Sequence, residues 1–221
     1  SPLKQCIVRD FGFLAWILTM TTAGLNEWRL WRVGNATIIS SGEAWVGIWR
    51  MCFYSHVLPD MENCRSISIS DSFLPVEIPV AQVLMMLAAI FGLAANICAA
   101  VAVRMAYFSV EDRRSIRLVF LLAGALYLLT GTSSLVPLAW NMNSVLKNST
   151  IDFPPEFQIP APPVSQRVGS AIGVGLCASV ATLLSGLDGC LSTKVIINFI
   201  SVTEECSVCV CVCVLVASAF M

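Results

Sequence analysis

Long apolar stretches separated by polar segments dominate the pattern of this chain. A helix needs about 20 mainly apolar residues to cross about 30 Å of bilayer hydrocarbon. Stretches of that length lie at about 7–25, 80–103, 116–140 and 168–191. The pattern therefore predicts a transmembrane helix at each. A cleaved signal peptide is the alternative for the first, but no small-residue cleavage site precedes the polar run that begins at Asn26.

The segments between these stretches differ in character. The segment at 26–79 is long, 104–115 is a short loop, 141–167 is a second polar segment, and 192–221 is a hydrophobic, atypical tail. Within the first segment, the letters RSISIS at 65–70 alternate polar and apolar, which is typical of a half-buried strand. Residues 37–39 and 44–54 are rich in β-branched and aromatic side chains, which favours strands. We expect a small antiparallel sheet there.

Composition supports a membrane protein. Hydrophobic residues make up 57% of the chain and charged residues 12%, whereas soluble domains carry about 25% charged residues. The mean hydropathy is +0.80. A net charge of −1 argues against a nucleic-acid partner, which selects a basic surface.

Orientation follows from the distribution of basic residues. Most of those near the apolar stretches fall on one side, namely Lys4, Arg9, Arg104, Arg113, Arg114, Arg117 and Lys194. The positive-inside rule then predicts that both ends of residues 1–194 are cytosolic and that 26–79 and 141–167 are extracellular. The glycosylation acceptors Asn35 and Asn148 both fall in these outer segments.

The cysteines and the single histidine limit the kinds of site that this chain could form. Cys52 and Cys64 are the cysteines of the first outer segment, and an oxidising exterior favours a disulfide between them, with two free buried thiols as the alternative. A covalent cross-link is expected because so small a sheet has little hydrophobic core of its own. The cysteine run from 206 to 213 does not have zinc-site spacing. The sole histidine is His56, and no paired carboxylates or phosphate loop are present. We expect no metal, no cofactor and no enzymatic activity.

The apolar stretches contain regularly spaced small residues. On the fourth stretch they recur at every fourth position, and the pattern predicts a continuous strip that admits a neighbouring backbone. The positions are Gly169, Gly173, Cys177, Ala181, Ser185 and Gly189. The second stretch repeats the pattern at Ala88, Gly92, Asn96 and Ala100. Asn96 is a lone polar residue at mid-membrane, for which we predict an interhelical hydrogen bond, with a functional site as the alternative.

The first outer segment carries a motif that resembles a known family. Its residues are Trp28, then Gly47, Ile48 and Trp49, then Cys52 and Cys64. They resemble the W–GLW–C–C signature of claudins, with isoleucine in place of leucine. The resemblance extends over about residues 7–193, through helix ends at 81–85, 135–140 and 167–170. Gln82 stands where claudins usually have arginine.

This resemblance implies a fold and a function. The fold class would be an all-α membrane bundle with a small β domain, that is, a left-handed bundle of four transmembrane helices carrying a five-stranded extracellular antiparallel sheet. The function would be cell–cell adhesion at tight junctions in the plasma membrane. Copies of the chain and other claudins would associate in cis and in trans as a paracellular barrier or charge-selective channel. The alternative is an auxiliary subunit of a channel or receptor, because calcium-channel gamma subunits share the loop signature.

The resemblance also implies roles for particular residues. Cys52 and Cys64 would staple the sheet, and Trp28, Gly47 and Trp49 would seat it on the helix tops and bilayer surface. Phe153 and Phe157 would make apolar trans contacts, with loop packing as the alternative. Cys190 is a palmitoylation candidate. The C-terminus, ending in Met221, is a poor match to the motif that PDZ scaffolds bind.

Charges of the first outer segment would set an ion preference. Arg65 falls where family members carry selectivity residues, and Glu62 is placed to neutralise it; a solvated surface arginine is the alternative. The segment as a whole is nearly balanced, with Arg29, Arg32, Arg50 and Arg65 against Glu43, Asp60, Glu62, Asp71 and Glu77.

Overall fold

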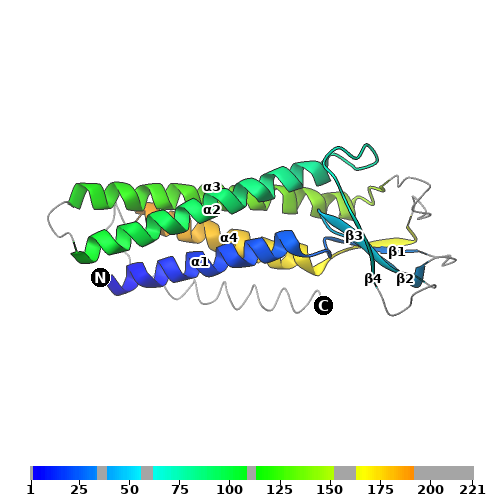
Figure 1. The fold of residues 1–221 in the computed structure, drawn as a ribbon, viewed down its shortest axis with the longest axis horizontal. Coiled ribbons are helices and arrows are strands. Elements are labelled where there is room, and N and C mark those ends of the chain that lie inside the picture. The colour runs from blue at the N-terminus through cyan, green and yellow to red at the C-terminus, as the bar shows by residue number, and fades with distance from the viewer. Residues whose placement is uncertain (1, 34–38, 56–61, 109–112, 152–162, 192–221) are drawn as a thin grey trace.

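The computed structural model describes all residues except 1, 34–38, 56–61, 109–112, 152–162 and 192–221. Four helices lie side by side along the long axis, and a sheet stands at one end of them (Figure 1). The helices are α1 (Pro2–Gly24), α2 (Glu77–Phe108), α3 (Arg113–Leu146) and α4 (Ser170–Leu191). The strands are β1 (Arg29–Arg32), β2 (Ile39–Val46), β3 (Arg50–Ser55), β4 (Glu62–Ser66) and β5 (Ser165–Val168).

Three helices of the described part, α2, α3 and α4, are long and apolar enough to cross a membrane. The apolar part of α1 is shorter and runs over Phe11–Gly24. Large apolar side chains on the outer surface of the bundle point away from the other helices, as Leu14, Ile90 and Leu118 do at 58% exposure each. Such a surface is compatible with lipid and not with water.

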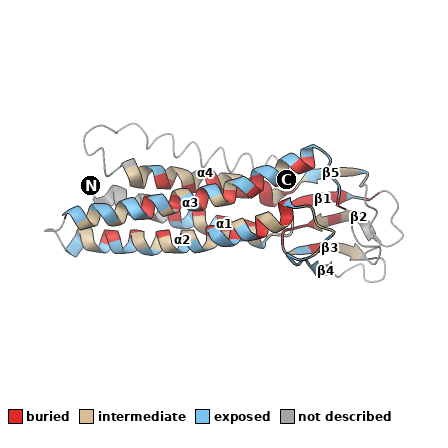
Figure 2. Ribbon diagram, turned by 90° about the horizontal axis from the view of Figure 1, so that it is seen from above, coloured by how far each residue is buried: buried red, intermediate tan, exposed pale blue. Residues whose placement is uncertain are grey.

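The buried face of α2 follows a heptad pattern. Its buried positions include Ile78, Ala81, Met85, Ala88, Gly92, Ala95, Ala99 and Ala102. Their spacing alternates between three and four residues, which is the repeat of left-handed helix packing. Figure 2 shows buried residues recurring on the facing sides of the helices and gathering where the bundle meets the sheet.

This heptad spacing explains why the predicted small-residue strips are not continuous along the contact faces. Each step of four residues advances about 40° around a helix of 3.6 residues per turn, so a strip at every fourth position winds off the contact face. On α2, Gly92 is buried but Ala100 is exposed. On α4, a Cβ at Gly173 would meet nothing within 4 Å. The close approach of α4 to α3 is made near Gly186, beside Leu128, and near Gly189, a member of the predicted strip, beside Gly124.

The interhelical hydrogen bond predicted for Asn96 is present. The Tyr127 hydroxyl of α3 donates to Asn96 Oδ1 over 2.7 Å, and Asn96 Nδ2 donates to the Gly92 carbonyl over 2.7 Å. Tyr127 also packs on α1, because a Cβ at Gly12 would lie 2.8 Å from its ring. This polar pair therefore ties α1, α2 and α3 together.

The strands form one antiparallel sheet in the order β4-β3-β2-β1-β5. The first four come from the segment between α1 and α2, and β5 comes from the segment just before α4. Its inner face packs on a core that includes Trp31, Val46, Met51 and Ile151. The five-stranded sheet implied by the resemblance is confirmed.

The strand boundaries differ from the sequence predictions. The stretch at 44–54 is two strands, because the chain reverses at 47–49 and the Gly47 amide donates to the Arg50 carbonyl. The strand predicted at 65–70 is wrong beyond Ser66. There the Asp71 carboxylate accepts from the Ser68 amide over 2.8 Å and turns the chain, so Ile67 enters the core while Ile69 is 55% exposed.

Candidate functional site

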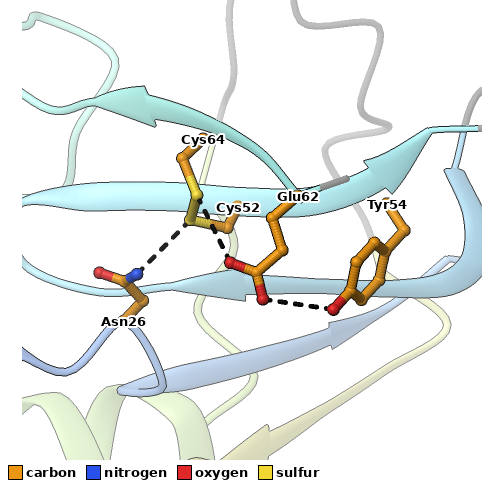
Figure 3. Close-up of a disulfide and its surroundings, with 5 residues drawn as sticks. All are labelled: Asn26, Cys52, Tyr54, Glu62 and Cys64. Carbon is orange, nitrogen blue, oxygen red and sulfur yellow. Dashed lines mark hydrogen bonds between the residues drawn. A yellow bond between two sulfur atoms is a disulfide. The ribbon is translucent and has the colours of Figure 1, made fainter. Parts of the chain in front are cut away.

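The candidate functional site is the sheet together with the helix ends that carry it. The predicted disulfide joins β3 to β4, where Cys52 and Cys64 are direct cross-strand partners with Cα atoms 4.1 Å apart (Figure 3). Asn26, in the connection from α1, donates from Nδ2 to Cys52 Sγ over 3.6 Å. β4 is an edge strand with every residue exposed, so burial of its side chains does not hold it in place. The disulfide instead holds β4 to β3.

The outer face of the sheet carries an aromatic and acidic group beside the disulfide. The Tyr54 hydroxyl donates to Glu62 Oε1 over 3.3 Å (Figure 3). The Tyr54 ring packs edge-on against Trp45, with 5.2 Å between ring centroids. The Glu62 carboxylate raises the pKa of Tyr54 above its ordinary value. Glu62 and the two sulfurs lie within 4.8 Å of one another. Metal ligation requires thiolates, however, and these sulfurs are bonded to each other.

The signature residues lie at the junction between sheet and bundle. Trp28 is buried, and its Nε1 donates to the Thr22 carbonyl at the end of α1 over 3.0 Å. Trp28 and Ile48 share a buried cluster with Met85, Leu138 and Ile172, against which Trp49 is partly packed. Gly47 leaves no room for a side chain, because a Cβ there would lie 2.8 Å from Asn26 Cα. The motif thus sets the sheet directly on the helix ends.

Gln82 fastens α2 to two separate points of the sheet. Its Nε2 donates to the Ile48 carbonyl over 2.6 Å and to the Ile67 carbonyl over 3.3 Å. Both acceptors come from turns beside strands, and the Gln82 side chain is fully buried. A buried carbonyl without a donor costs about 1–3 kcal/mol, so this one amide stabilises both turns. In the sequence, Gln82 is marked only by standing where claudins usually have arginine.

A buried ion pair joins β1 to the start of α2. Arg29 is 1% exposed, and its Nη2 lies 3.0 Å from Glu77 Oε1. The same Nη2 donates to Asn141 Oδ1 of α3 over 2.7 Å, and the Ser144 hydroxyl donates to Glu77 Oε1. Burial lowers the pKa of the Arg29 guanidinium, and Glu77 partly offsets that effect. We call these four residues the polar seam.

The polar seam corrects the sequence reading of the outer charges. The sequence places Arg29 and Glu77 among the charges of the first outer segment, but in the fold their side chains pair with each other beneath the sheet. The pair is 48 residues apart in sequence, so no local pattern indicated it. Asn141 and Ser144 were also missed, because α3 continues past Trp140 to Leu146 and carries them up to the sheet.

The remaining charges lie on two faces of the sheet. Arg32 pairs with Glu43 at 3.1 Å on the outer face, and both side chains are exposed. Glu62 and Arg65 are three residues apart on β4, so the pleat directs them to opposite faces. Arg65 is paired in register with Met51 on the core side, and it is exposed at the sheet edge. Neutralisation of Arg65 by Glu62 stays a prediction.

Several predicted sites lie elsewhere. Asn35, Phe153, Phe157 and His56 are outside the described residues. Asn148 is exposed just beyond the end of α3. The Cys190 sulfur lies at the contact between α3 and α4, since a Cβ at Gly124 would come within 2.9 Å of it. Palmitoylation of Cys190 stays a prediction.

Comparisons with known proteins agree with this geometry. A family model described as "PMP-22/EMP/MP20/Claudin tight junction" matches residues 13–187. The chain is 27% identical to claudin-3 of Rattus norvegicus over 188 residues, which is 83% of this chain and 79% of the relative. It is 26% identical to claudin-2 of Bos taurus over 190 residues, which is 85% of this chain and 77% of the relative.

Proposed function

Because this chain belongs to the PMP-22/EMP/MP20/claudin family of tight-junction proteins, we propose that it joins cells through contacts between copies of its own outer sheet and those of other claudins. Contacts within one membrane would align the copies, and contacts across the gap would join two cells. The resulting assembly would act as a paracellular barrier or a charge-selective path. The role is structural, and no chemical step is assigned to it.

The observation that carries this proposal is the rigid seat of the sheet. Three kinds of contact hold it to the helix ends: the signature cluster around Trp28, the Gln82 amide and the polar seam. In addition, β5 pairs with β1 and leads directly into α4. A sheet fixed in this way keeps a constant orientation to the membrane. Repeated side-by-side contacts need such a constant orientation, because each copy must present the same surface to the next.

The free edge at β4 favours specific contacts over indiscriminate ones. In the described part, no strand pairs with β4 on its outer side, and the strand reads ENCRS with all residues exposed. Charged side chains on an edge strand disfavour pairing with arbitrary strands. A neighbour that matches the charges of Glu62 and Arg65 would be accepted, and this is a selection a family of related chains requires.

Arg65 gives the proposed path its charge preference. Of the four arginines in the first outer segment, Arg29 is buried and Arg32 is paired with Glu43, while Arg50 and Arg65 are both exposed, on opposite faces of the sheet. Arg65 is exposed on the core side of the edge strand, away from the face that holds Glu62. A fixed positive charge beside a narrow aqueous path repels cations, so we expect a preference for anions.

Distribution between cells tests the adhesive role. In cells that lack junctions, the chain should concentrate where two expressing cells touch and not at borders with non-expressing cells. Phe153→Ala with Phe157→Ala should reduce that enrichment, whereas Leu118→Ala, on the lipid-facing side of α3, serves as the matched control. An auxiliary subunit would spread evenly and concentrate only with its channel partner. Even distribution of a chain that reaches the surface would contradict the adhesive role.

A further inference from the structure

The end of α3 is closed by an asparagine in a left-handed conformation. Asn148 has φ of 53°. Its amide donates to the Val145 carbonyl and the Ser149 amide donates to the Ser144 carbonyl, each over 3.0 Å. These two hydrogen bonds are the pattern of a Schellman cap, in which the left-handed residue is usually glycine. Glycine would serve the backbone better, so the asparagine side chain needs a reason of its own.

That side chain is presented for modification. Asn148, Ser149 and Thr150 are all exposed, and they form an Asn-X-Thr triplet. Among the described residues none hydrogen-bonds the Asn148 side chain, while Ile151 directly after the triplet is fully buried. The triplet is therefore an anchored turn whose acceptor amide points into solvent. Oligosaccharide is attached to such triplets on exposed surfaces of secretory-pathway proteins.

We propose that Asn148 carries an N-linked glycan, which stands beside the β5 edge of the sheet. The Ser149 carbonyl accepts from Gln166 Nε2 of β5 over 3.0 Å, so the acceptor is tied to that strand. The strand order places β5 and β4 at opposite edges. A bulky hydrated glycan would therefore shield the β5 edge and leave the β4 edge bare. This inference rests on the proposed orientation, with the sheet outside the cell.

Substitutions within the triplet separate the glycan from the helix cap. Asn35→Gln provides the background, because Asn35 and Asn148 head the two Asn-X-Ser/Thr triplets of the sequence. In this background, N-glycosidase should increase the gel mobility of the chain by one glycan. Thr150→Ala and Asn148→Gly should abolish the mobility change, and Asn148→Gly keeps the left-handed cap. Ser149→Ala should retain the change and is the matched control. No change in the background and in Ser149→Ala overturns the proposal.

Orientation is read separately with an N-terminal tag. Antibody should reach the tag in cells whose plasma membrane alone has been opened. A reachable tag with no glycan overturns the glycan and leaves the proposed function standing. A tag that antibody reaches in intact cells, or only after internal membranes are opened, places the sheet in the cytosol and overturns both.

Shielding has its own readout. At contacts between expressing cells, Thr150→Ala should be more enriched than Ser149→Ala, because it frees the β5 edge. Equal enrichment, with equal delivery to the surface, would overturn the shielding part of the inference.

Discussion

At the scale of single residues, the polar seam has an energetic cost as well as a role. Of the guanidinium nitrogens of Arg29, Nη2 donates to Glu77 and Asn141. The buried Nε and Nη1 have no hydrogen-bond partner among the described residues. Desolvating an ion pair often outweighs its attraction, so this pair adds specificity to the seating of the sheet more than stability. Its geometry fixes which part of β1 lies over α2 and α3.

Removing the charge of Arg29 alone should destabilise the protein more than removing the charges of both Arg29 and Glu77. Arg29→Met leaves the Glu77 carboxylate without its cation and should destabilise the protein by about 3–5 kcal/mol. Arg29→Met with Glu77→Gln removes the stranded charge, so it should recover part of that loss. Thermal unfolding of the detergent-solubilised variants measures both effects. A double variant less stable than the single one would contradict this account.

Gln82 offers a second test at the same scale. Gln82→Met keeps the length of the side chain but removes the donor from two buried carbonyls, so we expect a loss of about 1–3 kcal/mol. Gln82→Arg, the residue usual in claudins, retains donors and should lose less. Surface labelling measures how much of each variant reaches the cell surface, and we expect the more destabilised variant to reach it less. Equal delivery of Gln82→Met and the parent would show that the amide is dispensable.

At the scale of elements, β5 and α4 depend on a close backbone approach. Gly169 stands between them, and its amide donates to the Trp28 carbonyl over 3.0 Å. A Cβ at Gly169 would lie 1.9 Å from the Glu27 carbonyl oxygen, which is backbone and cannot move aside like a side chain. The glycine thereby allows β5 to pair with β1 just before α4 enters the bundle.

A pair of glycine substitutions tests this approach. Gly169→Ala should destabilise the protein by about 1–3 kcal/mol through overpacking against the backbone. Gly173→Ala, one helical turn further on, meets nothing within 4 Å and should be close to neutral. Detergent-phase thermal unfolding of the two variants provides the comparison. A larger loss for Gly173→Ala than for Gly169→Ala would overturn the assigned packing.

Elements also show what sequence patterns could predict. The long apolar stretches predicted the helices, and cysteine placement predicted the disulfide, because length and oxidation state are local or compositional properties. The end of β4 was wrong because the Asp71 side chain, outside the alternating stretch, captures the Ser68 amide. The strip on α4 is not continuous because the partner helix decides which positions are contacted. The Arg29–Glu77 pair could not be predicted, because it joins segments that meet only in the fold.

At the scale of the whole molecule, the sheet and bundle act as one body in which both outer segments meet at the same end (Figure 1). The sheet takes strands from both, since β5 pairs with β1. A structural change in one outer segment should therefore also alter the surface formed by the other segment. Charge on the first segment and contacts on the second are parts of one proposed interface.

Ion preference is a property of that interface. Arg65→Glu reverses a fixed charge at the sheet edge, so epithelial monolayers expressing it should become more cation-permeable than those expressing the parent. Arg50→Glu, which lies at an exposed position of β3 on the opposite face, is the matched control. Dilution potentials measure the permeability ratio of sodium to chloride. A larger change with Arg50→Glu would move the charge-setting face to the other side of the sheet.

Freeze-fracture imaging of expressing cells that otherwise lack junctions shows whether this chain assembles into strands. The account predicts continuous rows of intramembrane particles at contacts between expressing cells. Cys52→Ser with Cys64→Ser should abolish the rows, because losing a disulfide from a small extracellular domain costs about 2–5 kcal/mol. Scattered single particles at those contacts, formed by a parent chain with full surface delivery, would contradict the account.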